Sequence, residues 1–284
     1  MLAEGAAQDG LAGHRQAWHG DHHVHVDGAD HDHVPHVGPV CGRGGSTGKA
    51  TCNYRVPMSH PFPELPRPQA VIFDLDGTLV ATVETRIRAW LITFAEAQIP
   101  AGRGDVAPLI GSDGKYLARE VARRAGRPLS DRRATEIDRR SGEVYSGLNT
   151  DPRPVPGARE LLQVLDQRQV PWAIATSSLR GQVARSVKAL ALSREPVIVD
   201  GSHVAHAKPE PDLLLEAAQR LGVRAPGCWY IGDATWDMLA AKRAKMYAIG
   251  VTSGAAGVAA LAAAGADLVV GSLAEVGDLV PATV

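Results

Sequence analysis

From residue 70 onward, short apolar runs alternate with longer amphipathic stretches. The runs predict strands at 70–74, 171–176, 197–199, 228–232, 247–251 and 267–270. Helical patterns lie between the later runs, at 157–168, 180–190, 211–221, 234–244 and 255–264. Continuous apolar strands that alternate with helices are typical of a sheet covered on both faces. The sequence therefore predicts an α/β fold, a Rossmann-like doubly wound parallel sheet.

The stretch between the first and second strands breaks this alternation. It contains only helical patterns, and in VETRIRAWLITFAEA the apolar residues Ile87, Trp90, Leu91 and Phe94 fall at i, i+3, i+4 and i+7. Further helices are expected near 114–125 and 131–146. We expect residues 83–149 to form a small helical cap domain over the carboxyl edge of the sheet, where open α/β sheets bind ligands. Residues 69–82 and 150–284 would form the α/β core.

Residues 1–68 differ in composition from the rest of the chain. They are rich in Gly, His, Asp and Pro, and six of the eleven histidines lie in HHVHVDGADHDHVPH. Such a composition buries too little apolar surface to offset the entropy of ordering, which predicts a disordered segment. Because closely spaced imidazoles suit Zn, Ni or Cu, a metal-binding protein acting through this segment is an alternative function of another class.

Charge and composition argue against several kinds of partner. The chain has 30 Lys plus Arg against 31 Asp plus Glu, so it has no basic field for nucleic acid or an anionic membrane. No stretch holds the roughly 20 uninterrupted apolar residues that a membrane span needs. The start MLAEGAAQDG lacks the order of a secretory signal, and three cysteines are too few for a disulfide framework. We expect a cytoplasmic protein whose oligomeric state the sequence leaves open.

Polar residues follow the apolar runs in four separate segments. They are FDLDGT (73–78), AIATSS (173–178), HAKPEPD (206–212) and YIGDATWD (230–237). The carboxyl ends of parallel strands meet at one edge, so we expect the four segments to converge. The groups that would meet are Asp74 and Asp76, Thr176 with the Ser177 amide, Lys208, and Asp233 with Asp237.

The charge of this group limits what it can bind. Four carboxylates against one ammonium leave a formal charge of about −3, which is prohibitive in a partly buried pocket without a cation. Oxygen ligands favour Mg²⁺, which commonly accompanies a substrate phosphate. Lys208 supplies a positive charge and Thr176 a hydroxyl, while the amides after Thr176 and Asp74 can form an anion-binding nest. The site therefore suits a small-molecule phosphate ester.

The two aspartates after the first strand can divide a phosphoryl transfer between them. One would attack phosphorus to give an aspartyl-phosphate, and the other would protonate the leaving alcohol and then deprotonate a water. Gly77 permits the sharp turn that exposes both. Each segment alone has a structural alternative: a turn for DGT, a helix cap for Thr176, a solvated loop for Lys208, and first-turn acids for Asp233 and Asp237. Their joint occurrence favours the site.

In this order and with these residues, the four segments resemble those of the haloacid dehalogenase superfamily of phosphohydrolases. The resemblance covers residues 70–280 and is greatest for the subgroup with a helical cap inserted after the first motif, which contains phosphoglycolate phosphatases and β-phosphoglucomutases. It implies that Asp74 is the nucleophile and Asp76 the general acid/base, and that Thr176 and Lys208 hold the phosphoryl oxygens. It also implies Mg²⁺ bound by Asp74, the Asp76 carbonyl and Asp233, with Asp237 orienting these ligands.

The chain departs from the related mutases at two positions. Ala81 stands where the family often has a further Asp, and Arg86 stands where the mutases have a cap His. Arginine suits a substrate phosphate or carboxylate but cannot shuttle a proton near neutral pH, which favours hydrolysis over intramolecular transfer. The alternative role for Arg86 is to anchor the cap helix through an ion pair.

The cap segment LIGSDGKYLARE (109–120) passes from a loop into a helix, as expected of a segment that faces substrate. Ser112 and Lys115 are candidate specificity contacts, with a plain helix N-terminus as the alternative. The predicted substrate contacts are Gly77, Ser177, Arg86 and Lys115. The sequence thus predicts a Mg²⁺-dependent phosphatase of small phosphomonoesters, of the phosphoglycolate or sugar-phosphate type, with a phosphosugar mutase as the alternative of the same fold.

Overall fold

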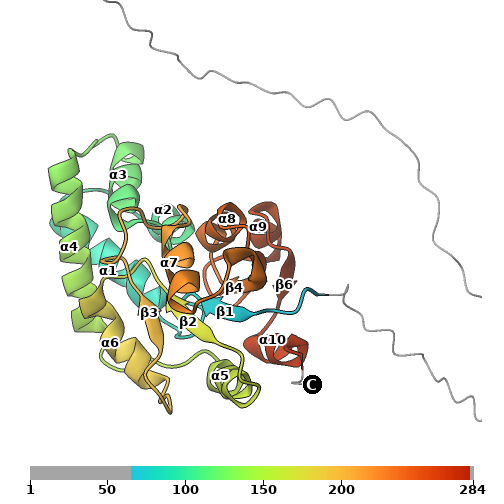
Figure 1. Cartoon of the computed structure of the whole chain (residues 1–284). Helices are drawn as coiled ribbons and strands as arrows, with labels where there is room; N and C mark the ends of the chain where they lie inside the picture. Colours follow the sequence, from blue (N-terminus) through green and yellow to red (C-terminus); the bar gives the residue numbers. More distant parts are fainter. Residues whose placement is uncertain (1–64, 282–284) are drawn as a thin grey trace, which may run out of the picture. The chain divides into compact units, whose positions relative to one another are not determined.

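The computed structural model describes residues 65–281, which contain a single six-stranded sheet (Figure 1). The predictions of disorder and of metal binding by the His-rich segment lie outside the described residues, apart from 65–68. The strands are β1 (Ala70–Phe73), β2 (Trp172–Ala175), β3 (Val197–Val199), β4 (Cys228–Gly232), β5 (Tyr247–Val251) and β6 (Leu268–Val270). Their order is β3-β2-β1-β4-β5-β6, and every neighbouring pair is parallel. The predicted α/β fold is confirmed.

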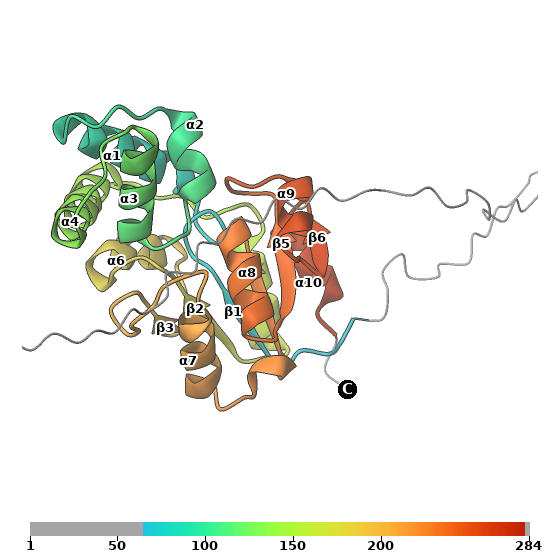
Figure 2. The same cartoon turned by 90° about the horizontal axis from the view of Figure 1, so that it is seen from above.

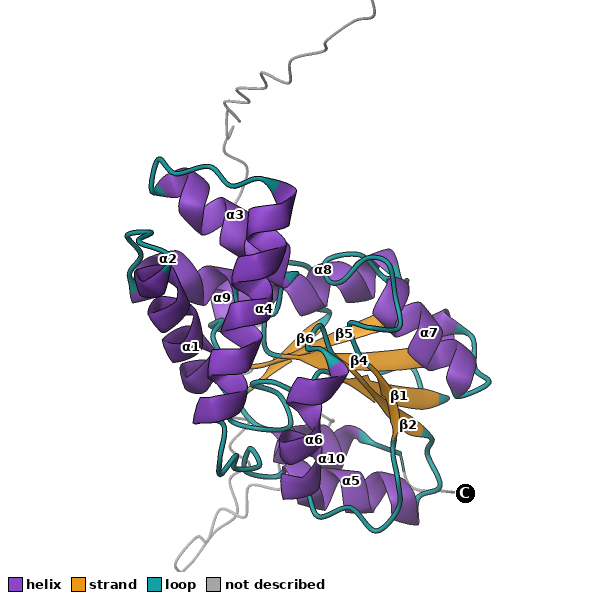
Figure 3. Cartoon of the chain, turned by 90° about the vertical axis from the view of Figure 1, so that its left-hand side faces the viewer, coloured by secondary structure: helices purple, strands orange, loops and turns teal. Residues whose placement is uncertain are grey.

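Helices cover both faces of the sheet (Figure 3). One face packs against α5 (Ala158–Gln167), α6 (Arg180–Ala189) and α10 (Leu273–Leu279). The other packs against α7 (Asp212–Arg220), α8 (Thr235–Arg243) and α9 (Val258–Ala263), and a short 3₁₀ helix, η2 (Ala225–Gly227), precedes β4. No helix within residues 65–281 combines the length and the apolar character that crossing a bilayer requires.

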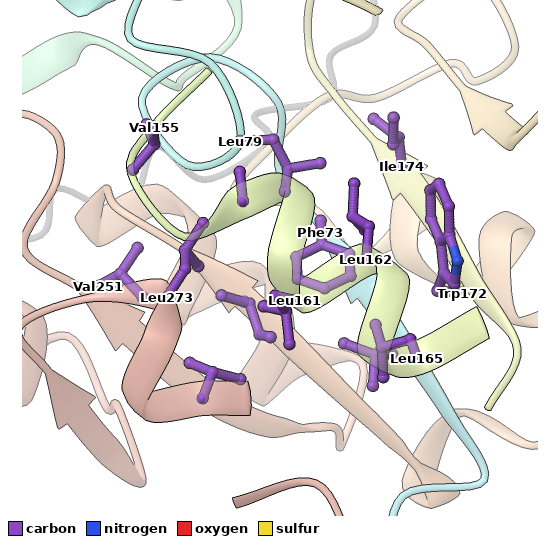
Figure 4. Packing of buried hydrophobic residues seen from close by; sticks show 14 of the residues in the cluster. Phe73, Leu79, Val155, Leu161, Leu162, Leu165, Trp172, Ile174, Val251 and Leu273 are labelled. Atoms are coloured by element: carbon purple, nitrogen blue, oxygen red, sulfur yellow. The ribbon is translucent and has the colours of Figure 1, made fainter. Parts of the chain in front are cut away.

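Burial on both faces explains why the strands are apolar throughout. Val71 and Phe73 of β1 point into one cluster, while Ala70 and Ile72 point into the other. In the first cluster, Phe73 meets the ring of Trp172 edge-on, with 6.4 Å between centroids, beneath the leucines of α5 (Figure 4). A buried aromatic or aliphatic side chain of this kind contributes about 1.5–3 kcal/mol. The strand that carries Asp74 is therefore held rigidly in the middle of the sheet.

Residues 83–148, called the cap below, are helical as predicted. They form α1 (Val83–Glu96), α2 (Arg103–Val106), the 3₁₀ helix η1 (Ala107–Leu109), α3 (Gly114–Arg124) and α4 (Asp131–Leu148). These helices gather beside the sheet (Figure 2) around a separate apolar cluster that includes Ile87, Trp90, Phe94, Leu117 and Ile137. The cap thus has an apolar cluster of its own, and its standing as a distinct domain stays a prediction.

The predicted boundaries agree with the structure to within two residues, with one exception. The helix predicted from residue 255 begins instead at Val258. The amide of Ala255 donates to the Asp233 carboxylate at 3.3 Å, and that of Ala256 to the Asp233 carbonyl at 3.3 Å. Alanine favours helix, but these contacts hold the segment as a loop against the site. The helices α2 and α10 were not predicted.

Candidate active site

The four polar segments converge at the carboxyl edge of the sheet. Phe73 of β1 is in register with Ile174 of β2 and Ile231 of β4, so the residues that follow these strands are neighbours. Asp74 and Thr176 line a cavity of about 300 Å³ whose other wall belongs to the cap. The convergence predicted from strand ends is confirmed.

Lys208 lies beneath this cavity between two carboxylates. Its side chain is fully buried, with Nζ 2.5 Å from Asp74 Oδ1 and 2.9 Å from Asp237 Oδ1. Burial would lower the pKa of Lys208, but Asp237 and Asp74 together hold it above its ordinary value. The ammonium therefore stays charged and fixes one oxygen of Asp74. Among the described residues, no hydrogen bond reaches the other oxygen, Oδ2.

Three buried carboxylates, those of Asp74, Asp233 and Asp237, each place an oxygen within 4.8 Å of the others. Burial raises the pKa of Asp74 to about 7, against the opposing effect of Lys208, with Asp237 raising it further. Burial, then Asp237 and Asp74, raise the pKa of Asp233 well above its ordinary value. Such shifts arise where like charges are crowded away from water, and a bound cation relieves them.

The charge of the cluster matches a divalent cation. Its three carboxylates contribute −3 and Lys208 contributes +1, which leaves a formal charge of −2. The formal charge of −3 expected from the sequence also counted Asp76. In the structure, Asp76 pairs with Arg86 and is left out of the cluster. Hard oxygen donors and a charge of −2 fit Mg²⁺ well. Asp237 is the most heavily engaged of the three, because Tyr230 Oη donates to Oδ1 at 3.0 Å and the Ala234 amide donates to Oδ2 at 2.9 Å.

Gly77 makes the close approach of Asp233 possible. Its φ of +95° lies in the left-handed region, and a Cβ there would come 2.4 Å from Asp233 Oδ2. The neighbouring Thr78 donates its hydroxyl to Asp233 Oδ1 at 2.7 Å. The DGT sequence thus does two things, since the glycine admits the carboxylate and the threonine orients it.

Asp76 belongs to a separate network that faces the cap. Its Oδ2 accepts hydrogen bonds from Arg86 at 2.9 Å and Ser178 at 2.5 Å. Its Oδ1 accepts from the hydroxyls of Thr82 at 2.6 Å and Tyr145 at 3.0 Å. Burial alone would raise the pKa of Asp76, but Arg86 and then these hydrogen bonds hold it below its ordinary value. Asp76 is therefore ionised in this arrangement, whereas burial and Asp237 raise the pKa of the neighbouring Asp74.

Arg86 forms the ion pair proposed as its alternative role, and its partner is Asp76 itself. The guanidinium stacks on the ring of Tyr145, 3.4 Å from its centroid, and donates to Gln182 Oε1 at 2.8 Å. Since Arg86 lies on α1 and Gln182 on α6, this residue joins the cap to the core. It also lines the cavity, so a contact with substrate stays a prediction.

Thr176, Ser177, Ser112 and Lys115, which were also predicted, line the cavity. They differ in whether their side chains already have a hydrogen-bond partner. Thr176 Oγ1 accepts a hydrogen bond from the Ser178 amide at 3.2 Å, and Ser177 Oγ donates to the cap at Gly111 O over 3.3 Å. Ser112 Oγ is 2.7 Å from Leu109 O, a bond within its own loop. Lys115 lines the cavity and has no hydrogen bond or ion pair within residues 65–281.

Further contacts close the cap over the core. Trp236 Nε1 donates to Pro108 O at 3.1 Å, and the Asp113 amide donates to Lys208 O at 3.2 Å. Tyr116 meets Trp236 edge-on, with 5.5 Å between centroids. The loop that carries the buried lysine therefore touches the cap directly.

Sequence reasoning missed several residues of the site. Thr78 and Ser178 stand inside segments already identified, and their hydroxyls beside acidic residues were the available signal. Tyr145 and Tyr230 gave no such signal, because a tyrosine in a helix or strand usually packs in the core.

Known proteins are similar to this chain over most of its described residues. The family model described as haloacid dehalogenase-like hydrolase matches residues 71–251. A protein of Dickeya dadantii (strain 3937) named probable phosphatase IndB is 32% identical over 210 residues, which cover 72% of this chain and 90% of the relative. β-Phosphoglucomutase of Bacillus subtilis (strain 168) is 31% identical over 208 residues, 71% of this chain and 88% of the relative. The crystal structure of a hydrolase from Pseudomonas syringae, 34% identical, gives a TM-score of 0.70 over 74% of this chain and 96% of that one.

Proposed function

This chain belongs to the haloacid dehalogenase-like hydrolase family, and from that premise we propose that it is a Mg²⁺-dependent phosphatase of small phosphomonoesters. One observation carries the proposal. Lys208 holds one oxygen of Asp74 and leaves the other free at a cavity, and Asp74 forms with Asp233 and Asp237 a cluster of three carboxylates that suits a cation. An uncommitted carboxylate oxygen next to positive charge is what attack on a phosphate ester requires. The near balance of charge supports a small substrate, and we propose that the enzyme acts in the cytoplasm.

The two aspartates would carry out the reaction in two steps. Asp76, which the arrangement described above holds ionised, would first take up a proton from solvent. In the first step, Asp74 Oδ2 attacks phosphorus, the phosphorus–oxygen bond of the ester breaks, and the leaving alcohol takes that proton from Asp76. In the second, Asp76 removes a proton from water, the water oxygen attacks phosphorus, the bond between phosphorus and Asp74 breaks, and inorganic phosphate leaves. Thr176 and the amide of Ser177 would bind the phosphoryl oxygens, with Lys208 opposing their charge. The predicted contact from Gly77 is not supported, because its amide donates to Val80 O at 2.7 Å.

A Mg²⁺ ion would be held by Asp74, the backbone carbonyl of Asp76 and Asp233. When bound, it would supply positive charge against the phosphoryl group and against the crowded carboxylates. Asp237 acts through this chain's own residues, because its hydrogen bonds fix Lys208 and the start of α8. Thr78 and Gly77 keep Asp233 in place.

Arg86 supports hydrolysis over the mutase alternative. Its ion pair with Asp76 places it in the proton-transfer network, and that pairing holds the pKa of Arg86 above its ordinary value despite burial. A residue that stays charged can orient a proton donor but cannot pass a proton between two sugar hydroxyls. The phosphosugar mutase of the same fold therefore stands as the alternative that product analysis would detect.

The test is a Mg²⁺-dependent screen of the full chain against a panel of phosphomonoesters, with Asp74→Asn alongside. We expect release of inorganic phosphate, lowered by at least about 10³-fold in the variant because the nucleophile is lost. Asp105→Asn, at a cap position remote from the cavity, is the matched control and should keep wild-type turnover. Near wild-type turnover in folded Asp74→Asn would contradict the assignment, and isomerised product without phosphate release would establish the mutase.

A further inference from the structure

Two charged side chains on the cap wall of the cavity make no hydrogen bond or close ion pair. Asp138 on α4 and Lys115 on α3 both line the cavity, and neither makes a hydrogen bond or ion pair with any residue in 65–281. The other charged residues of this wall are engaged: Arg86 with Asp76, and Asp113 with the Tyr116 amide. Their opposite charges act on each other only at longer range, so the donor atoms of Lys115 and the acceptor atoms of Asp138 are available to a ligand.

The fold makes room for the Asp138 carboxylate. Gly114 begins α3 directly opposite, and a Cβ at that position would come 1.9 Å from Asp138 Oδ1. Burial raises the pKa of Asp138 to about 6, and Asp113 raises it further, while Lys115 and Arg86 act in the opposite direction. Asp138 is thus a poorly solvated acceptor at the cavity, with the Lys115 ammonium as a nearby donor.

We propose that Asp138 and Lys115 bind the alcohol half of the substrate and select a neutral polyhydroxylated leaving group, a sugar or polyol, over one that carries a carboxylate. A hydroxyl both donates and accepts, so neighbouring hydroxyls can donate to Asp138 and accept from Lys115 at once. This inference rests on the proposed phosphatase function and names its substrate class.

The charges of the cavity argue against a second anionic group. Asp76 neutralises Arg86, and among the described residues that line the cavity Lys115 is the one other cation. Asp138 opposes Lys115 from the same wall, so the carboxylate of phosphoglycolate would find no net positive charge. A carboxylate beside Asp138 would also meet like-charge repulsion.

The experiment compares three esters with the full chain and Mg²⁺: a hexitol phosphate, 2-phosphoglycolate, and p-nitrophenyl phosphate, which has no hydroxyl on its leaving group. We expect kcat/KM for the hexitol phosphate to exceed that for phosphoglycolate by at least about 10-fold. Asp138→Ala should lower kcat/KM for the hexitol phosphate by about 10- to 100-fold, chiefly through KM, because a hydrogen bond to a charged group is lost. Turnover of p-nitrophenyl phosphate should change less than about two-fold, since the variant leaves the chemistry alone.

Two further variants keep the proposal falsifiable if Asp138→Ala folds poorly. Asp138→Lys should raise kcat/KM for phosphoglycolate, because the wall then carries two cations. Glu136→Ala, on an exposed part of the same helix, is the control and should change none of the three. In the inactive Asp74→Asn background, the hexitol phosphate should raise Tm, and Asp138→Ala should remove most of that increase.

The outcomes separate the two proposals. If p-nitrophenyl phosphate and the hexitol phosphate are hydrolysed but phosphoglycolate is preferred, the substrate class is wrong and the phosphatase stands. An equal loss on all three esters in Asp138→Ala would also overturn the subsite, since it would show a merely structural role. If wild-type enzyme hydrolyses no ester, both proposals fail together.

Discussion

The carboxylate cluster around Lys208, called the floor below, and the cap wall of the cavity are built in opposite ways. On the floor, each charged side chain has a hydrogen-bonding partner, with Lys208 between Asp74 and Asp237 and Thr78 on Asp233. On the cap wall, Asp138 and Lys115 line the cavity and make no hydrogen bond or close ion pair in the described part of the chain. The floor is rigid because its groups orient one another, whereas the wall leaves its charges available for a ligand. We therefore expect the floor to carry out the reaction and the cap wall to select the substrate.

The largest expected effect comes from disrupting the floor at the cation site that we propose. Removal of Mg²⁺ by a chelator, or Asp233→Asn, should lower turnover by about three orders of magnitude, because neutralisation of the crowded carboxylates and the phosphoryl charge is lost. Steady-state kinetics with and without added Mg²⁺ measure it. Asp200→Asn removes an equally buried carboxylate outside the cluster and should keep its response to Mg²⁺. Full activity of wild-type enzyme in chelator would refute the cation.

A smaller effect tests how tightly the floor is packed. Gly77→Ala should lower the free energy of unfolding by about 2–4 kcal/mol, because it adds a Cβ 2.4 Å from Asp233 Oδ2 at a residue with φ of +95°. Gly126→Ala in the cap is a matched control, since its φ is +69° but nothing lies within 4 Å of the added atom. It should cost only about 1 kcal/mol. Denaturant unfolding of both variants compares them, and equal losses would show that the approach to Asp233 does not matter.

The smallest effect concerns the stability of the cap wall. The pKa of Asp138 is about 6 in the folded chain, against an ordinary value of 3.8. Ionisation of Asp138 therefore favours the unfolded chain. Wild-type stability should therefore fall as pH rises from 4 to 6, and Asp138→Asn should be more stable by about 1–2 kcal/mol at pH 8. The advantage should shrink as pH falls through 6. A difference that stays constant from pH 4.5 to 8 would show that Asp138 is not a costly charge.

The floor could be predicted from sequence because strand registers determine it. The residues after β1 and β4 must be neighbours once those strands pair, and Asp74 and Asp233 stand there. The cap wall could be predicted only in part, since Arg86 and Lys115 were named from the sequence but Asp138 was not. Asp138 lies in a helix whose polar residues look alike in sequence, and which of them line the cavity depends on how the cap meets the core. Such contacts join segments far apart in the chain.

The unpredicted helix α10 shows a different limit. Its seven residues are too few to display a full amphipathic pattern, yet Ser272 and Glu275 form a start signal that is readable in the sequence. No sequence pattern indicated the late start of α9. Alanines favour helix locally, and only the bonds from Ala255 and Ala256 to Asp233 reverse that preference.

The bond between Arg86 and Asp76 makes proton uptake and movement of the cap two sides of one equilibrium. Arg86 belongs to α1 and Asp76 to the loop after β1, so any motion that withdrew α1 would remove the charge that most lowers the pKa of Asp76. Withdrawal would then raise the proton affinity of Asp76, and by reciprocity a proton on Asp76 would loosen its hold on the cap. In the proposed reaction Asp76 is protonated for one step and ionised for the other, so this ion pair would connect the position of the cap to the protonation of Asp76.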